Sequence, residues 1–379
     1  MKSFLRYASA ILVLSGAGAT ASAQSEFVIG APLMFSGPGA FTGESTKAAL
    51  DMLAEEANAK GGIAGRKVRI VYYDTEGKPD NAVRVLNRML KSDRVEAVIG
   101  PVGSWEVPPV KRLLEAGSTP TVLLSSARAF VEPVSRCIFK VPADERSVAG
   151  RAYEYVRSLR LSKVAIVTQQ DAYGDGGQRE LKAQAKDFGM EIVADEKYAM
   201  EDTDLAPLLT RVRRTNPQVV INWSSSRAPI VLTNAYRQMG MTQPLVHGPA
   251  ALSEAVIKGT GANGEGILVA GAKLDAAGEL SDDDPQKPAL IKFRDAYRAK
   301  YSKDPNQFAA NAHDAFGLIA AALVRARGDS GKVCDELNRT NKFAGATAVF
   351  TYTESDHVGP GPDSVVVYRL QDGKWKLAR

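Results

Sequence analysis

Several hallmarks of enzymes are missing from this sequence. Only three histidines occur in 379 residues, and His247, His313 and His357 lack the spacing of metal ligands. The chain has no G-x-x-x-x-G-K-[ST], no G-x-G-x-x-G after a predicted strand and no G-x-S-x-G, so nucleotide-binding and serine-hydrolase motifs are absent. We therefore expect no metal site, no cofactor and no enzymatic activity.

Long hydrophobic runs are also scarce. The apolar run 8–19 is too short to span a bilayer, which needs about 20 residues, and no later stretch is longer. Lys2 and Arg6 precede this run, and Ala21-Ser22-Ala23 follows it as a small-residue cleavage site. Residues 1–23 therefore read as a signal peptide. No lipobox cysteine follows the run, so we expect export to the periplasm without a lipid anchor.

Charge of one sign is not concentrated anywhere. The formal net charge is +5, and removal of Lys2 and Arg6 with the signal peptide would lower it by two. The positive residues are spread along the chain without a basic block, so we expect no nucleic-acid partner. An exported protein can form a disulfide between its two cysteines, Cys137 and Cys334, but the sequence is equally compatible with buried free thiols.

The stretch 95–127 is the most informative part of the sequence. A short apolar strand, 95–99, ends at Gly100-Pro101, and a helical pattern begins near Ser104. A second strand, 121–124, is followed by Ser125-Ser126. Ligands of open α/β sheets bind at the carboxyl ends of strands, and helix starts favour anions. The two serine turns therefore suggest a carboxylate cradle, although serine is also a common helix cap.

Strands and helices alternate in two successive units, which predicts two doubly wound parallel α/β lobes. In the first unit, strands at 27–32 and 67–73 precede the stretch above, with helices over 45–60 and 81–90. In the second, strands at 164–168, 192–194, 219–222 and 244–247 alternate with helices over 178–188, 205–214 and 228–239. A polar, glycine-rich turn is expected over 169–177.

The last third of the chain is expected to complete both lobes. It contains a strand at 266–270, helices over 289–301 and 308–326, and a hairpin over 365–377 that turns at Asp372-Gly373. We assign 24–141 plus 271–350 to the first lobe and 142–270 plus 351–379 to the second. The chain then crosses three times between the lobes, and such a hinge can open and close a cleft.

Several motifs together resemble one family. They are PLMFSGPGAFTG, NAKGGIAGRKVRIVYYD, VIGPVGS, AYGDG and NAHDAFGLIAAAL, and they run in order over nearly all of the chain after residue 23. The sequence is identified as a member of the leucine/isoleucine/valine-binding type of periplasmic solute receptor. This resemblance implies the type I periplasmic binding-protein fold and service to an ATP-driven (ABC) importer, through an inner-membrane permease. We expect a monomer.

The resemblance also implies binding-site positions. A serine that holds the ligand carboxylate falls on Ser104, and a second contact falls on 125–127. Where relatives have a threonine this chain has Ala127, so Ser126 or a backbone N–H would serve instead. The residues that line the side-chain pocket fall on Phe41 and Thr42, and the tyrosine that closes over the ligand falls on Tyr173. The strand-end contact of the second lobe falls on Ser224 or Ser225. Together with Ser104, Ser125 and Ser126, these residues make up most of the predicted site.

One position departs from the pattern of amino-acid receptors. They place an acidic residue after the strand 244–247 to pair with the ligand ammonium, whereas this chain has Ala250, with Glu254 four residues further on. A buried ammonium without a carboxylate is costly. We therefore expect the ligand to be an amino acid or a related small carboxylate without an amino group, such as a keto acid or an aromatic acid, for which Trp105, Phe41 and Tyr173 could line an apolar pocket. The alternative function is a ligand-sensing input protein of a signalling system.

Overall fold

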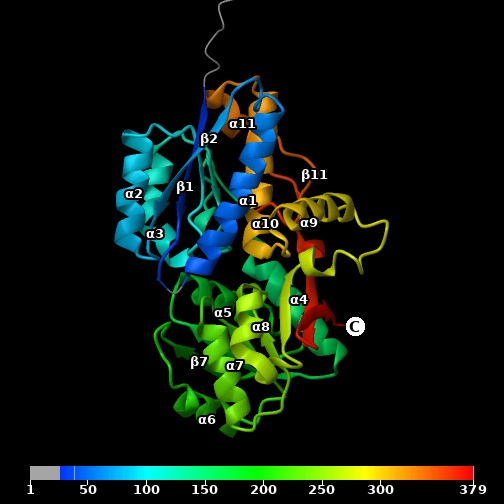
Figure 1. Ribbon diagram of the computed structural model, residues 1–379. Coiled ribbons are helices and arrows are strands. Elements are labelled where there is room, and N and C mark those ends of the chain that lie inside the picture. The colour runs from blue at the N-terminus through cyan, green and yellow to red at the C-terminus, as the bar shows by residue number, and fades with distance from the viewer. Residues whose placement is uncertain (1–25, 38, 379) are drawn as a thin grey trace, which may run out of the picture.

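The computed structural model describes residues 26–37 and 39–378, and it consists of two α/β lobes stacked one above the other (Figure 1). The predicted signal peptide, residues 1–23, lies outside the described residues. Within those residues, no helix combines the length and the apolar character needed to cross a bilayer.

The first lobe is built on a five-stranded parallel sheet with the order β2-β1-β3-β4-β5. The strands are β1 (Phe27–Leu33), β2 (Val68–Asp74), β3 (Ala97–Ile99), β4 (Thr121–Leu123) and β5 (Ile138–Lys140). The order reverses between β1 and β3, and such a switch point opens a crevice at the carboxyl ends of the strands. The turns after β1 and β3 therefore border a natural binding site.

Helices cover both faces of this sheet, as the alternation of side chains along β1 requires. Phe27 and Ile29 belong to one core cluster and Val28 to another. The helices are α1 (Ala40–Ala59), α2 (Pro79–Lys91), α3 (Val107–Ala116), α9 (Lys287–Tyr301), α10 (Gln307–Arg325) and α11 (Val333–Asn338). Figure 1 shows α2 and α3 on one side and α1 with α10 on the other. The late helices thus complete the first lobe.

The second lobe contains a seven-stranded sheet with the order β14-β13-β10-β9-β8-β6-β7. Its parallel strands are β6 (Lys163–Gln169), β7 (Glu191–Tyr198), β8 (Val219–Trp223), β9 (Leu245–His247) and β10 (Leu268–Ala272), and the hairpin β13 (Val365–Gln371) and β14 (Lys374–Leu377) pairs antiparallel to β10. The helices are α4 (Glu145–Ser158), α5 (Ala172–Gln184), α6 (Ala206–Arg214), α7 (Ala228–Gln238) and α8 (Glu254–Thr260). A short ribbon, β11 (Phe343–Ala344) with β12 (Val349–Phe350), lies apart from both sheets.

The chain passes between the two sheets three times. The first passage follows β5, the second follows β10, and the third precedes β13. On the third passage the chain still runs beside β5, because the Lys140 N–H donates to the His357 carbonyl and the Tyr352 hydroxyl donates to the Lys140 carbonyl. The doubly wound α/β class predicted from the sequence is confirmed.

Two local predictions differ from the structure. The turn expected over 169–177 is wrong, since α5 begins at Ala172. Its glycines occur where side chains would clash: a Cβ on Gly174 would lie 1.8 Å from the Gln169 carbonyl oxygen, and one on Gly177 would lie 2.2 Å from the Trp223 ring. Helix α4 was not predicted, although Val148, Ala149, Ala152, Tyr153 and Val156 are buried at helical spacing.

Candidate functional site

A cavity of about 80 Å³ lies between the two lobes. One water needs about 10–15 Å³ of such volume, so the cavity can hold several waters or a small organic molecule. The apolar part of its wall comprises Met34, Val102, Trp105, Leu124, Pro142, Ala143, Pro249, Ala250, Ala272 and Phe308. The polar part comprises Thr42, Ser104, Ser126, Tyr173, Ser225, Ser226, Gln307, Asn311 and Thr347, with Gly103 and Gly271 between them.

The wall is assembled from turns at the carboxyl ends of the parallel strands. The first lobe contributes the turns after β1, β3 and β4, and the second contributes those after β6, β8 and β9 and the last residues of β10. Both switch points, β1/β3 and β6/β8, therefore face the same cavity. The connection after β5 also contributes, which places the first crossing at the cavity wall.

Seven of the residues predicted as ligand contacts line this cavity: Thr42, Ser104, Trp105, Ser126, Tyr173, Ser225 and Ala250. The segments that carry them are far apart in the sequence and come from both lobes. The structure therefore brings these seven positions together, and ligand contact by each of them stays a prediction.

The other four predicted residues lie outside the cavity wall. Phe41 points to Phe308, with 5.6 Å between their ring centroids. The Ser125 hydroxyl turns inward and donates to backbone carbonyls of the preceding turn at 3.0–3.1 Å. Ala127 packs in the core cluster beneath α3, and the Ser224 hydroxyl accepts from the Asn222 amide at 2.8 Å. Their side chains are already engaged within their own lobe.

Several polar groups in the wall have no partner among the described residues. Ser104 is 4% exposed, and its hydroxyl makes no hydrogen bond to any described residue. The hydroxyls of Ser126 and Ser226 and the amide of Asn311 are also without partners, and the buried hydroxyl of Ser225 is unsatisfied. Buried polar groups in proteins are normally hydrogen-bonded, so these groups are available to a bound molecule.

The electrostatic character of the cavity is set by helix starts rather than by charged side chains. Thr42 is in the first turn of α1, Ser104 begins the 3-10 turn η1 (Ser104–Glu106) that leads into α3, Tyr173 is in the first turn of α5, and Gln307 begins α10. Helix N-termini carry partial positive charge. Among the described residues, no Asp, Glu, Lys or Arg lines the cavity. The site therefore favours an anion with an apolar body.

Comparison with known proteins agrees with this geometry. The family model for periplasmic binding proteins matches residues 26–374. The chain belongs to the periplasmic binding protein family. The Leu/Ile/Val-binding protein homolog 3 of Brucella melitensis is 26% identical over 380 residues, covering 98% of each chain. The members of the family are solute-binding proteins, and the resemblance to the leucine/isoleucine/valine-binding type is confirmed.

Solved structures share the fold. An extracellular ligand-binding receptor from Rhodopseudomonas palustris HaA2 superposes with a TM-score of 0.87 at 24% identity, over 94% of this chain and 100% of its own. A solute-binding protein of an ABC transporter from R. palustris, solved in complex with benzoate, superposes with a TM-score of 0.81 at 20% identity, over 93% of this chain and 95% of its own. These structures establish the type I fold of this periplasmic binding protein.

Tyr173 is held across the second-lobe side of the cavity. Its hydroxyl accepts a hydrogen bond from the Ala250 N–H at 3.3 Å, and its ring lies 5.9 Å from that of Trp223. Burial raises the pKa of Tyr173 above its usual value. The phenol therefore stays protonated, and its O–H remains free to donate to a bound acceptor.

A buried polar network supports the second-lobe wall. The Asn222 amide donates to Ser224 and lies 2.9 Å from His247 Nδ1, while His247 Nε2 lies 3.0 Å from the Thr233 hydroxyl. The Thr233 hydroxyl donates to a carbonyl, so it accepts from Nε2–H, and Nδ1 accepts from Asn222. Burial lowers the pKa of His247 to about 3. A neutral His247 thus joins the ends of β8 and β9.

Glu106 supports the first-lobe wall and was missed by sequence reasoning. Its Oε2 accepts from the Gly103 N–H at 3.1 Å, which closes the turn that presents Ser104. A glutamate three residues after a helix start is the sequence signal for this contact. Burial raises the pKa of Glu106 to about 7. The carboxyl group therefore remains largely neutral below that pH.

Residues from α10 and the segment after it were also missed as cavity residues. Gln307 and Asn311 are four residues apart on one face of α10, and the Gln307 amide donates to the Pro249 carbonyl of the other lobe at 2.6 Å. Asp314 accepts from the N–H groups of residues 346 and 347 and from the Thr347 hydroxyl. These contacts bring the first-lobe helix α10 to the wall and position Thr347 beside it.

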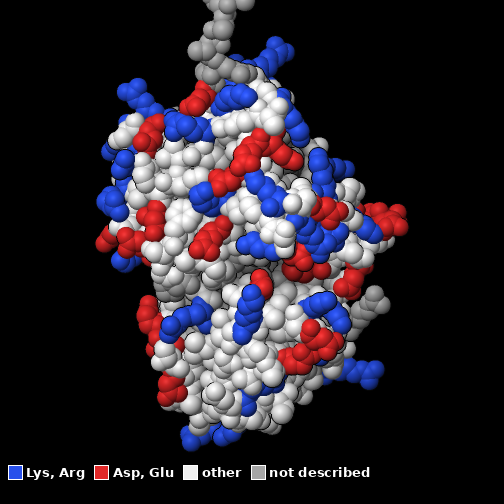
Figure 2. Space-filling model, in the orientation of Figure 1, with Lys and Arg blue, Asp and Glu red and all other residues white. Residues whose placement is uncertain are grey.

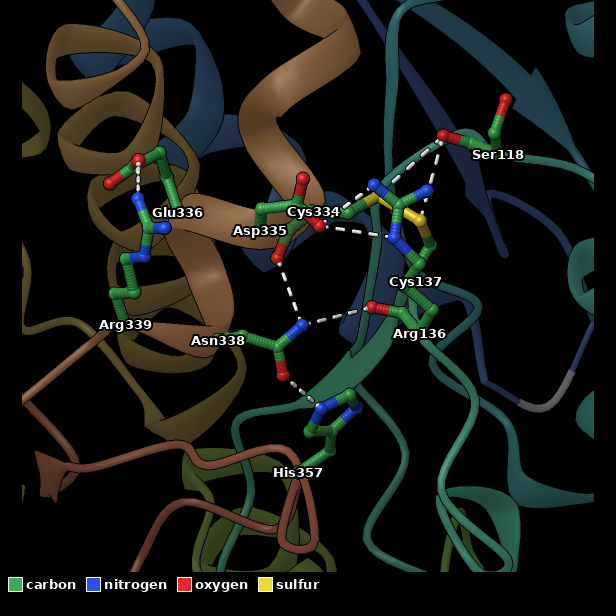
Figure 3. A network of polar contacts seen from close by, with 9 residues as sticks. All are labelled: Ser118, Arg136, Cys137, Cys334, Asp335, Glu336, Asn338, Arg339 and His357. Atoms are coloured by element: carbon green, nitrogen blue, oxygen red, sulfur yellow. Dashed lines mark hydrogen bonds and ion pairs between the residues drawn. A yellow bond between two sulfur atoms is a disulfide. The ribbon is translucent and has the colours of Figure 1, made fainter.

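The two cysteines are joined as a disulfide, which decides the alternative left open by the sequence. Cys137 precedes β5 and Cys334 lies in α11. Figure 3 shows the bond flanked by an ion pair between Arg136 and Asp335 at 2.7 Å and by Asn338, whose amide donates to the Arg136 carbonyl. None of these residues lines the cavity. The cross-link fixes a late helix to the first sheet.

The outer surface has charges of both signs. Figure 2 shows Lys and Arg interspersed with Asp and Glu over the visible face, without a field of one sign. Many of these residues form ion pairs at the surface, such as Lys182 with Asp195. The cavity wall, by contrast, has no charged side chain among the described residues.

Proposed function

We propose that this protein is the substrate-binding component of an ABC importer and binds an amino acid or a related small carboxylate in the interlobe cavity. The observation that carries the proposal is the cavity itself, where buried hydroxyls without partners meet four helix starts. The ligand carboxylate accepts from Ser104 and Ser126 on one lobe and from Tyr173 and Ser225 on the other. The family and its relatives support this function.

Ligand binding is coupled to lobe closure in this proposal. A ligand that touches Ser104 and Tyr173 at once makes its full set of contacts only when the lobes are together, so it stabilises the closed state by the difference in contacts. The contact between Gln307 and the Pro249 carbonyl adds to that state. The closed protein is then recognised by the inner-membrane permease in the periplasm, and it performs no catalysis.

The test is a thermal-shift screen of amino acids and small carboxylic acids, followed by small-angle X-ray scattering. A ligand that binds only the native state raises Tm. We expect at least one small carboxylate to raise Tm and to reduce the radius of gyration. A screen in which no small carboxylate changes Tm contradicts the proposed ligand class, and an unchanged scattering profile at saturation contradicts the closure mechanism.

The alternative function is a ligand-sensing input protein with the same fold. The two functions differ in what fails when the gene is deleted. An importer component is required for uptake of the radiolabelled ligand into cells, whereas a sensor is required only for the transcriptional response to it. Loss of the response with unchanged uptake would favour the sensor.

A further inference from the structure

We propose that the ligand is an organic acid that carries no ammonium group. This inference rests on the proposed function and narrows its ligand class. The described wall offers donors to a carboxylate and no carboxylate to a cation. An α-amino acid would have to bury its ammonium group against this wall without a charged partner.

Three acidic residues close to the wall in sequence accept hydrogen bonds from backbone N–H groups, although Oε1 of Glu106 and Oε1 of Glu145 have no partner among the described residues. Glu106 accepts from the Gly103 N–H, and Glu145 accepts from the Arg128 N–H at 3.0 Å. Asp171 caps α5 by accepting from the Gly174 N–H at 2.8 Å. None of these three carboxyl groups lines the cavity. Each of these carboxyl groups binds a backbone N–H group in a segment next to the cavity wall.

Two other acids near the cavity are no better placed. Asp314 receives three hydrogen bonds from residues 346 and 347, all between 2.6 and 2.7 Å. Glu254, the one acid that follows β9 closely in sequence, has a side chain that is 70% exposed and pairs with Lys258. Ala250 occupies the wall at this turn instead. No described acid is therefore positioned to receive an ammonium group.

Neutral acceptors in the wall, such as the Asn311 amide oxygen and the serine hydroxyls, carry no charge to balance an ammonium group. The Pro249 carbonyl already accepts from Gln307, and those of Pro101 and Val102 already accept from Ser125. The helix starts around the cavity repel a cation as they attract an anion. Burying a charge without a charged partner is unfavourable. We therefore expect an amino acid to bind more weakly here than the corresponding acid without the amino group, because only the amino acid buries an ammonium group.

The rest of the wall defines the body of the ligand. Met34, Leu124 and Phe308 are apolar, and the Trp105 ring is held by a hydrogen bond from its Nε1–H to the Gly77 carbonyl at 2.8 Å. These side chains favour an aliphatic or aromatic hydrocarbon group. The ligand class is thus a monocarboxylate with an apolar body.

The decisive experiment is calorimetric titration of the wild-type protein with two matched pairs. L-Phenylalanine differs from 3-phenylpropanoate, and L-leucine from 4-methylpentanoate, only by the α-ammonium group. We expect the acid to bind at least tenfold more tightly than its amino acid in each pair that binds. Equal or tighter binding of the amino acid overturns this inference and leaves the proposed function standing. Binding of none of the four compounds contradicts this inference, and the thermal-shift screen then decides the proposed function separately.

A pair of variants tests the wall position directly. Ala250→Glu places a carboxylate at the cavity, and Ala250→Gln provides the same shape without charge. We expect the affinity ratio of acid to amino acid to fall at least tenfold in the Glu variant relative to the Gln variant, since only Glu pairs with an ammonium and repels a plain acid. Equal ratios in two folded variants contradict the inference; if the Glu variant does not fold, the wild-type pairs decide.

Discussion

Glu106 offers a sharp test of how the first-lobe wall is built. Its side chain is 0% exposed. Oε2 accepts from the Gly103 N–H at 3.1 Å, whereas Oε1 has no partner among the described residues. Burial raises the pKa of Glu106 from 4.5 to about 7. We predict that Glu106→Gln, which keeps the shape and the acceptor but cannot ionise, changes how stability depends on pH.

The sign follows from the proton balance. Between pH 4.5 and 7 the unfolded chain loses the Glu106 proton while the folded protein keeps it, so the free energy of unfolding falls as the pH rises through this window. The contribution is fully present below pH 4.5 and is lost by about pH 7. A shift of this size corresponds to about 3 kcal/mol. The Gln variant escapes this loss, so its stability relative to wild type rises by that amount.

The assay is urea denaturation of both proteins at several values between pH 4.5 and 7.5. The control is Glu56→Gln, since Glu56 is exposed on α1, and its stability relative to wild type should change little over this range. Comparing differences from wild type removes the contribution of every other titrating group. If Glu106→Gln and wild type run parallel across the range, the carboxyl group is not buried as described and the reasoning is refuted.

Three further predictions concern the cavity, the second-lobe network and the disulfide. Ser104→Ala should weaken binding of the best acid about 10- to 100-fold by calorimetry, because a hydrogen bond to a charged group contributes about 1.5–3 kcal/mol. The Ser125 hydroxyl faces backbone carbonyls, so Ser125→Ala should lower Tm and leave affinity within about threefold. The reverse pattern would mean that Ser125, not Ser104, contacts the ligand. His247 is 1% exposed, and burial lowers its pKa from 6.5 to about 3, so below pH 6.5 only the unfolded chain gains its proton. The stability advantage of wild type over His247→Gln should therefore shrink by about 2 kcal/mol between pH 7.5 and 5 in urea denaturation, and a constant advantage would contradict a buried neutral imidazole. Replacing Cys137 and Cys334 by serine should lower the free energy of unfolding by about 2–5 kcal/mol, because a cross-link over a long loop restricts the unfolded chain. Chemical reduction of the wild type should lower the free energy of unfolding by a similar amount. An unchanged stability after both the substitution and the reduction would contradict the cross-link.

Local sequence patterns were sufficient for most strands and helices, although not for α4 or the start of α5, and for the turns after β3 and β4 that face the cavity. The strand over 95–99 and its turn at Ser104 could be recognised because apolar runs, glycine-proline turns and helix starts depend on neighbouring residues. These local patterns could not show which of the two adjacent serines, Ser125 or Ser126, faces the cavity. Ser125 and Ser126 point to different sides of the chain, and only the packing of the preceding turn directs Ser125 to the backbone carbonyls.

The glycines of α5 show a second limit of sequence reasoning. Three glycines within 174–177 are typical of a turn, yet here they begin a helix that packs closely on Gln169, Glu145 and Trp223. The requirement for small residues comes from partners that are distant in the sequence. Local propensity therefore predicted the wrong element, because tertiary contacts outweigh the modest helical cost of glycine.

The sequence by itself determined the α/β fold class and indicated two lobes, because these follow from periodicity and from turns at strand ends. The seven predicted residues that line the cavity were found from the serine turns together with the family resemblance. Only the tertiary structure decided the pairing of Cys137 with Cys334, 197 residues apart, and the contribution of α10 to the wall. It also decided that the wall carries no charged side chain among the described residues. That property belongs to no single segment, since it depends on how turns from both lobes converge and where their acids point.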